Sequence, residues 1–385
     1  MPSIGSRALF PDLDARVYLN HASISPPSRP VREAVVALLD RYGHVGTAAF
    51  PEAAAQRDHL RASLGTLMGC EAEDIALTGS TTRGIIDLSV CLHWEPGDRI
   101  VCFRGEFPAN TTPWLRAAAA TGAEVVWVDQ DGLPDEAVVD AVRAVCEEGD
   151  VRMVACSLVQ FATGRVMPVA DLAALAHAHG AYIAVDAIQG LGVVPVDVRA
   201  LDVDFLLGGG HKWLMGLEGV GFAYVHPRAL DVLEPRTAGW LSHEDPLAFL
   251  LEGPGHLDPL APIRHEAGFL EAHSGNALGC AALDASVAIL LELGVPAIHA
   301  HVTAWLDAAE DGLVERGFTS LRDRASSSGT LSLLPPDGDA IRWNHALNEA
   351  GISVSAPDGR LRLSPHWPNA LDEVDVLLAT VDGLR

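Results

Sequence analysis

One stretch of the chain places a carboxylate, a histidine and a lysine at the ends of apolar runs. Asp186 ends the run AYIAV, and the run 203–207 leads into three glycines followed by His211 and Lys212. Apolar runs separated by turns predict strands of an α/β sheet, which binds ligands at its strand ends. A lysine can form a Schiff base with a carbonyl cofactor, while a carboxylate holds the proton on a pyridine nitrogen. The alternative for Lys212 is a surface lysine in a glycine-rich loop.

The sequence around this stretch predicts the elements that hold it in place. Apolar runs such as AEVVWVD and VRMVACSLV alternate with helical patterns such as PDEAVVDAVRAVCEE. This alternation favours a mainly parallel sheet with helices on its faces. From about residue 300 a helix, AWLDAAEDGLVERG, and short strands such as TLSLLP indicate a smaller α+β unit. We expect an N-terminal arm over 1–30, a large domain over 31–265 and a small C-terminal domain over 266–385.

Three motifs, VDAIQG, GHKWLMGLEGVGFAYV and LRLSPHWPNA, follow one another along the chain. With them the sequence resembles the pyridoxal-phosphate enzymes of aminotransferase class V. That family includes cysteine desulfurases, selenocysteine lyases, kynureninases and isopenicillin N epimerase-like proteins. The resemblance extends over nearly the whole chain and implies the α/β fold-type I architecture, in which the large domain holds a mainly parallel seven-stranded sheet. It also implies a bound pyridoxal 5′-phosphate, an amino-acid substrate and a homodimer with shared active sites.

The resemblance gives the residues of the central stretch individual roles. It implies that Lys212 forms the Schiff base and, once freed by substrate, takes the Cα proton as general base. Asp186 is expected on the pyridine nitrogen, although it could instead cap the following turn. Gln189 is expected near the phenolic oxygen of the cofactor, and His211 either contacts the phosphate or packs under the ring. Desulfurases often carry a serine where this chain has Gly209.

A second group of residues is expected to hold the cofactor phosphate. Thr81 and Thr82 open a predicted helix, where unpaired N–H groups and the helix dipole favour an anion. An ordinary N-cap is the alternative for this Ser/Thr cluster. Ser274 keeps the hydroxyl of a family motif that reaches the phosphate of the neighbouring subunit, so the resemblance implies the same here. His273 replaces a glycine of that motif and lies either at the mouth of the partner's site or simply exposed.

The loop after the strand IVCF is expected to cover the cofactor ring. Phe107 stands where desulfurases have a ring-stacking histidine, and kynureninases have an FP pair, so we expect it to stack on the pyridine. The alternative is a phenylalanine that anchors the loop in the core. Asn110 follows at a spacing that brings its amide near cofactor or substrate. Many desulfurases carry an asparagine at the loop that begins at Gln160; here Gln160 or Thr163 replaces it, or the contact is absent.

Substrate contacts are expected from both ends of the chain. Relatives use the arginine of the LRLSPH motif for the substrate α-carboxylate, which a guanidinium binds with two parallel hydrogen bonds. This residue is Arg362, and Arg360 competes for the role because period-two alternation puts both on one face. In the N-terminal arm, Asn20 and His21 are expected near the substrate, with a local turn as the equal alternative.

Composition narrows the class of partner. The chain has 51 acidic and 26 basic residues and a net charge of −25, which excludes a typical nucleic-acid-binding surface. Its six cysteines show no CxxC and no metal-ligand spacing, so we expect no metal and a reducing cytoplasm. Neither a signal peptide nor an apolar run of membrane-spanning length is expected from the sequence.

The reaction after Cα deprotonation is the least determined feature. Desulfurases carry a nucleophilic cysteine on a small-domain loop, but no cysteine follows Cys280, and the loop reads SAPDGR. This excludes a persulfide relay at that position. Lyases and desulfurases often have His-Lys at the Schiff-base site, whereas transaminases often have Gln-Lys. We therefore expect a lyase that cleaves a Cβ bond such as C–S; an aminotransferase or an epimerase are the alternatives, and a non-catalytic scaffold is disfavoured because Lys212, Asp186 and Arg362 are all present.

Overall fold

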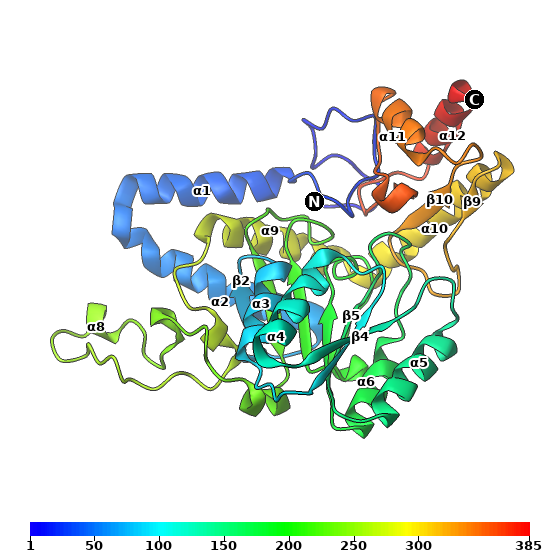
Figure 1. Cartoon of the computed structure of the whole chain (residues 1–385). Coiled ribbons are helices and arrows are strands. Elements are labelled where there is room, and N and C mark those ends of the chain that lie inside the picture. The colour runs from blue at the N-terminus through cyan, green and yellow to red at the C-terminus, as the bar shows by residue number, and fades with distance from the viewer.

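A seven-stranded sheet lies at the centre of the chain in a computed structural model that describes residues 1–385 (Figure 1). The strand order is β2-β8-β7-β6-β5-β3-β4, and β8 alone runs in the direction opposite to the other six strands. The strands are β2 (Ile75–Thr78), β3 (Arg99–Phe103), β4 (Glu124–Val128), β5 (Val151–Ser157), β6 (Tyr182–Asp186), β7 (Phe205–Gly209) and β8 (Gly221–Val225). The predicted mainly parallel α/β sheet is confirmed.

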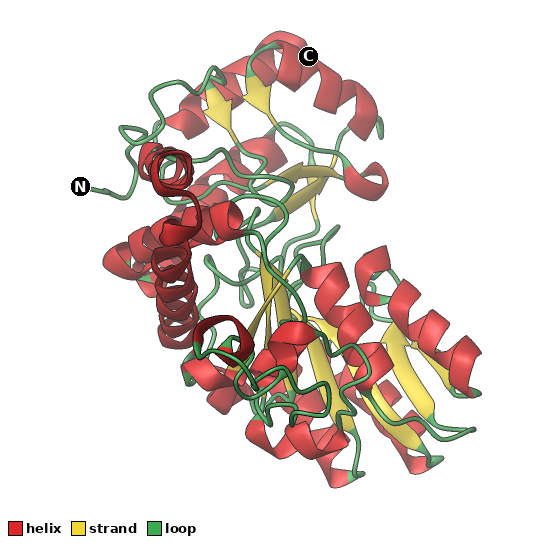
Figure 2. Ribbon diagram, turned by 90° about the vertical axis from the view of Figure 1, so that its left-hand side faces the viewer, coloured by secondary structure: helices red, strands yellow, loops and turns green.

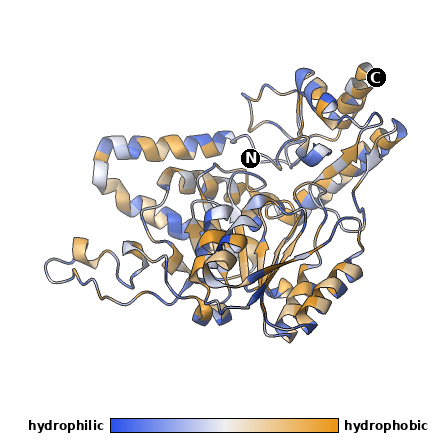
Figure 3. Cartoon of the chain, viewed as in Figure 1, coloured by the Kyte–Doolittle hydropathy of each residue, from blue (hydrophilic) through white to orange (hydrophobic).

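Helices cover both faces of this sheet (Figure 2). The interior strands are rich in Val, Ile, Leu and Ala, because strands covered on both sides must be apolar throughout (Figure 3). Gly122 ends α4 in the left-handed conformation, with φ of 83°, which a glycine adopts without strain. The helices of this part are α2 (Phe50–Met68), α3 (Thr81–Cys91), α4 (Thr112–Thr121), α5 (Asp135–Glu147), α6 (Val169–Ala178) and α7 (Val198–Leu201).

A smaller α+β unit contains the end of the chain and the N-terminal arm. Its antiparallel sheet has the order β12-β10-β9, and β1 of the arm pairs in parallel with β11. Both termini accordingly lie beside this unit (Figure 2). Its elements are β1 (Val17–Tyr18), α10 (Val295–Glu315), β9 (Thr319–Ser320), β10 (Leu331–Leu334), α11 (Ala340–Glu349), β11 (Ile352–Ser353), β12 (Leu361–Leu363) and α12 (Glu373–Leu384).

Two long helices and one excursion complete the molecule. Helix α9 (Ala277–Leu293) packs against α1 (Arg29–Val45) and α2, whereas α10 packs against α12. The prediction assigns α9 to the small domain, whereas α9 packs against the helices that precede the large sheet. The boundary at residue 265 stays a prediction. The excursion 240–262 holds the short α8 (Ala248–Leu251) and projects from the body (Figure 1). None of the helices taken alone has the length and hydropathy of a membrane span; α9 and α10 reach them only as a pair, which is bent by 79°.

Candidate active site

Four neighbouring strands end at one edge of the sheet and bring the candidate residues together. Strand β6 ends at Asp186, and β5 ends at Ser157, its partner in register. Three residues after β7 comes Lys212, and the turn after β3 carries Phe107. Carboxyl ends of parallel strands form the usual ligand-binding edge of an α/β sheet. The site therefore forms where the predicted motifs meet.

The amine of Lys212 lies in this edge, 5.5 Å from the centre of the Phe107 ring. The lysine keeps some exposed surface, but protein surrounds most of its amine. Burial lowers the pKa of Lys212 to about 8, the charge of Asp186 opposes that shift, and the charge of Arg362 adds to it. A lysine with this pKa spends part of its time uncharged near neutrality, as a nucleophile or a general base requires.

The backbone of the lysine segment is held by distant parts of the chain. The Ser25 amide donates to the His211 carbonyl at 2.8 Å, and the Ser25 hydroxyl donates to the Lys212 carbonyl at 2.6 Å. From the small unit, the His366 ring bonds the Trp213 carbonyl at 2.8 Å. The arm and the C-terminal unit thus fix the direction in which Lys212 leaves the sheet edge.

Asp186 is a buried carboxylate without an ion pair. Its Oδ1 accepts a hydrogen bond from the Ile188 amide at 2.9 Å. Burial raises the pKa of Asp186 to about 6, while the Ile188 bond and the charge of Lys212 oppose the rise. An enclosed carboxyl of this kind fits a protonated ring nitrogen, which would supply the missing cation.

The start of α3 has the features of a phosphate site. Ser80 is the N-cap, and its side chain accepts from the Arg83 amide at 3.1 Å. Thr81 is therefore not needed as a cap, and its hydroxyl is buried without any partner. Thr82 is exposed on the next position. An unpartnered hydroxyl at a helix N-terminus is a ready donor to an anion, so these residues fit the cofactor phosphate.

The surroundings of Gly209 explain why this chain has a glycine where desulfurases often have a serine. A Cβ on Gly209 would lie 3.1 Å from the Thr81 hydroxyl and 3.0 Å from the Ile188 side chain. A larger residue would crowd both groups. The half-buried His211 follows, and burial lowers the pKa of its imidazole, so the neutral form dominates near pH 7.

Phe107 presents an open aromatic ring. Its exposed fraction is 45%, and its ring meets Phe161 edge-on at 5.3 Å. A phenylalanine that anchored its loop in the core would be enclosed instead. The geometry therefore favours the stacking role. Nearby, the buried Asn110 uses its oxygen to accept from the Trp114 indole at 3.1 Å, and its amide lies near the Glu106 carboxyl, whose pKa it lowers.

Arg362 is a buried cation with neutral partners only. Its three nitrogens donate to the Ser355 hydroxyl at 3.1 Å, the Phe161 carbonyl at 2.8 Å and the Ser23 hydroxyl at 2.8 Å. Burial lowers the pKa of the guanidinium to about 10. A buried charge without a counter-ion is costly, so this position suits an anionic ligand.

Arg360 is separated from Arg362 in the structure. It forms ion pairs with Asp358 and Asp131 at the surface, where it lines a cavity of about 900 Å³ outside the lysine site. Arg360 has extended backbone angles directly before β12, so the expectation that both arginines share a face stays a prediction. The two differ in their partners, because Arg360 meets carboxylates and Arg362 meets none.

Other predicted residues are engaged inside the protein. Gln189 donates to the Ala22 carbonyl at 3.1 Å and accepts from the Trp213 indole at 3.0 Å, which leaves one amide hydrogen for a cofactor. His21 has almost no exposed surface and bonds the Ser25 hydroxyl at 2.7 Å, which points away from a direct substrate contact. The oxygen of Asn20 is buried and unpartnered.

In the loop after β5, neither Gln160 nor Thr163 is free to replace the asparagine that many desulfurases have there. The Gln160 oxygen accepts from the amides of Ala162 and Thr163, both at 2.7 Å, and its nitrogen donates to the Gly105 carbonyl. The Thr163 hydroxyl donates to the same oxygen. Both candidates therefore hold their own loop, which favours the absence of a cofactor contact.

Ser274 lies on an exposed loop before α9. Its neighbours His273 and Gly275 line a cavity of about 160 Å³ together with Gly79, which precedes α3. The loop is thus close to the phosphate side of its own chain. Its predicted reach into a partner subunit stays a prediction.

Sequence reasoning missed several contributors. Glu106, next to Phe107, buries its carboxyl against Ser157, and the hydroxyls of Ser23 and Ser355 orient Arg362. The only signal for Glu106 was its place beside a predicted site residue after a strand. Ser23 gave none, because Arg362 lies 339 positions away, and Ser355 gave none, because only the folded structure shows its hydroxyl on the guanidinium. No group of His, Cys, Asp and Glu side chains is arranged to hold a metal ion.

Comparison with known proteins identifies the family. The model of the family described as aminotransferase class-V matches residues 17–365. The chain belongs to this family. It is 30% identical to a probable cysteine desulfurase of Halobacterium salinarum, over 98% of this chain and 95% of the relative. It is likewise 30% identical to the cysteine desulfurase CsdA of Escherichia coli, over 98% and 96% of the two chains.

A solved structure of C-DES, a cystine C–S lyase, has the same fold. In that protein, a lysine-to-alanine variant carries glycine covalently linked to its pyridoxal-phosphate cofactor. The TM-score is 0.87, with 22% identity over 98% of each chain. The chain described here is a pyridoxal-phosphate-dependent class V enzyme, and the predicted family, fold and cofactor are confirmed.

Proposed function

We propose that this enzyme is a lyase that breaks a Cβ bond of an amino acid, C–S in a cysteine-like substrate, without forming a protein persulfide. The observation that carries this proposal is the absence of a thiol from the small-domain loop 355–360, where Ser355 bonds the Arg362 guanidinium. Five of the six cysteines are buried, and the sixth, Cys70, is partly buried after α2. The relatives named as cysteine desulfurases support C–S chemistry.

Each polar residue of the site has a task in this proposal. Pyridoxal phosphate, when bound, supplies an electron-accepting ring conjugated to the substrate Cα. Lys212 would hold the cofactor through its amine, and the same amine, when free, would take the proton from the substrate Cα. Asp186 would keep a proton on the pyridine nitrogen. Arg362 binds the α-carboxylate, and its orientation by Ser23 and Ser355 fixes which Cα bond faces Lys212.

The same proposal includes the residues that bind the cofactor phosphate and the homodimer. Thr81, Thr82 and His211 hold the phosphate, and a second copy of the chain supplies its Ser274 in a homodimer. Exposed leucines in the excursion 240–262 support association: Leu250, Leu251, Leu257 and Leu260 are 61–88% exposed. The free cysteines support a cytoplasmic location, since thiols persist in a reducing compartment.

A panel of amino acids tests the reaction class. S-substituted cysteines are added to the purified holoenzyme while its visible spectrum, pyruvate, ammonia and thiol are followed. A lyase yields pyruvate, ammonia and thiol in equal amounts and keeps its visible band through turnover. Conversion of the cofactor to its amine form, reversed only by a keto acid, would establish an aminotransferase instead, and racemisation without pyruvate would establish an epimerase.

A further inference from the structure

Glu106 is a buried carboxylate that the proposed mechanism does not use. It lies in the turn between β3 and Phe107, and its carboxyl is enclosed. Its Oε1 accepts from the Ser157 amide at 2.9 Å, and its Oε2 accepts from the Ser157 hydroxyl. No arginine, lysine or histidine pairs with it. Burying an unpaired carboxyl is costly, so its place in the site calls for a physical reason.

The position of Glu106 joins two parts of the cofactor site. Ser157 ends β5 and faces Asp186 in register on β6. Phe107 directly follows Glu106 in the chain, and Asn110 comes three residues later, shortly before α4. One carboxyl therefore fastens the loop that carries the open ring to the strand beside Asp186. The amide of Gln160, bonded to the Gly105 carbonyl, secures the other side of the same turn.

The surroundings of Glu106 are acidic. Burial raises the pKa of Glu106 to about 7; the Ser157 hydrogen bonds and the Asn110 amide oppose the rise, and the charge of Asp186 adds to it. The other titratable neighbours, Cys102 and Cys156, stay uncharged, because burial raises the pKa of both thiols. A cation bound at Asp186 would favour the ionised form of Glu106 as well.

We propose that Glu106 is a positioning residue for the cofactor: its carboxyl fixes the Phe107 loop to the Ser157 end of β5 and adds a second negative charge close to Asp186. The inference rests on the roles proposed above for Phe107 and Asp186, and it does not depend on the reaction class. It predicts that the shape and the charge of the Glu106 side chain contribute separately to holding the cofactor. A glutamine at this position keeps the shape and removes the charge.

Three variants and two readouts test this inference. Apoprotein of Glu106→Gln, Glu106→Ala and the exposed control Glu124→Gln is titrated with pyridoxal phosphate, and the pH midpoint of the visible band is then recorded. We expect Glu106→Ala to bind the cofactor at least about tenfold more weakly, because the Phe107 loop loses its tie. Glu106→Gln should bind within about threefold of wild type, yet shift the midpoint downward by about half a unit or more, because the positively charged, protonated cofactor loses an anionic neighbour.

Two results would overturn the inference: wild-type cofactor affinity in Glu106→Ala, or a wild-type midpoint in Glu106→Gln. If Glu106→Ala does not fold, as judged by circular dichroism, the midpoint of Glu106→Gln alone decides. Failure of the underlying roles has a different signature. In that case Phe107→Ala and Asp186→Ala would bind and titrate the cofactor as wild type does, whatever Glu106 shows.

Discussion

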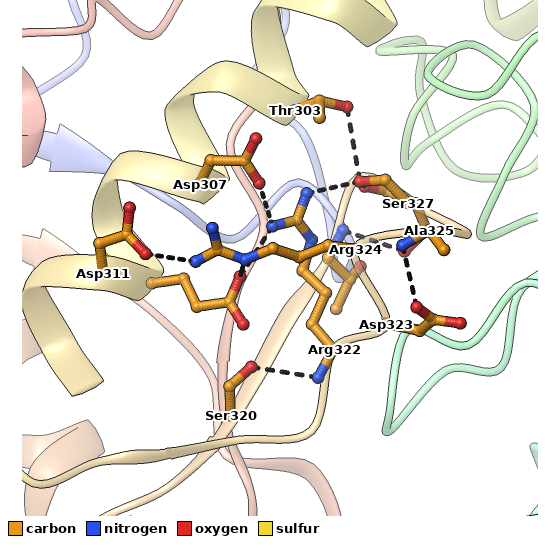
Figure 4. A network of polar contacts seen from close by, with 12 residues as sticks. Thr303, Asp307, Asp311, Ser320, Arg322, Asp323, Arg324, Ala325 and Ser327 are labelled. Atoms are coloured by element: carbon orange, nitrogen blue, oxygen red, sulfur yellow. Dashed lines mark hydrogen bonds and ion pairs between the residues drawn. The ribbon is translucent and has the colours of Figure 1, made fainter.

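Two regions of this enzyme bury arginine, and they do so in opposite ways. In the small unit, the Arg322 side chain is 3% exposed and donates to Asp307 at 2.6 Å and Glu310 at 2.9 Å (Figure 4). Arg324 adds a second cation to Glu310 at 2.8 Å. In the site, Arg362 is equally enclosed but meets only hydroxyls and a carbonyl.

The comparison distinguishes charged side chains that stabilise the fold from charged side chains that are suited to bind a ligand. Around Arg322 the buried charges neutralise one another, so nothing further is required there. In the site, Lys212 and Arg362 lack ion pairs, and so do Asp186 and Glu106. An amino acid and its cofactor would bring the missing partners: a carboxylate, a phosphate and a protonated ring. Substitutions in the two regions should therefore affect different measurements.

The largest effect is expected from Lys212→Ala. This change removes both the attachment of the cofactor and the proposed base, so turnover should fall by at least about 10⁴-fold. Steady-state assays of pyruvate release, with the visible spectrum as a second readout, measure it. A variant that kept a tenth of the activity would remove Lys212 from the centre of the mechanism.

Arg322→Ala should cost stability rather than activity. Removing one member of a buried ion pair leaves Glu310 and Asp307 partly unneutralised, at a cost of about 3–5 kcal/mol in unfolding free energy. Urea unfolding measures that loss. Below the unfolding transition, KM should stay within about twofold of wild type. A large change in KM at full folding would mean that this network communicates with the site.

Arg362→Ala should show the reverse pattern. Loss of a charge-assisted contact to the α-carboxylate should lower kcat/KM by about 10²-fold or more, chiefly through KM. The melting temperature should hold or rise, because an unpaired buried cation disappears. The matched control is Arg360→Ala. Because its ion pairs lie at the surface, it should change the free energy of unfolding and the transition-state binding energy by less than about 1 kcal/mol each. Equal effects of the two variants would remove the distinction between them.

The unpaired carboxyls should make the cofactor-free protein less stable as pH rises. The pKa of Glu106 is raised from 4.5 to about 7, so the folded state holds this proton more tightly than the unfolded state does. Stability from Glu106 is therefore full below about pH 4.5 and is lost up to about pH 7. Glu106→Gln should remove up to about 3 kcal/mol of that loss, as urea unfolding of apoprotein at pH 5 and pH 8 would reveal. An unchanged pH slope in the variant would contradict this.

Sequence reasoning was strongest where chemistry coincides with local pattern. Asp186 and Lys212 follow apolar strands, so their meeting at one sheet edge could be predicted from strand ends alone. The choice between Arg360 and Arg362 could not, because it depends on which guanidinium the fold places beside the carboxylates of Asp131 and Asp358 and which it buries without one. Glu106 escaped because its partner, Ser157, lies 51 residues away on a different strand.

The N-terminal arm has a consequence for how the enzyme folds. Ser25 holds the carbonyl of Lys212, while the Ala22 amide donates to the Ser364 hydroxyl, 342 positions further along the chain. The arm is thus held by contacts of very long range, and contacts of this kind form slowly because a long stretch of chain must first be closed. We therefore expect the backbone of Lys212 to reach its final setting among the last steps of folding.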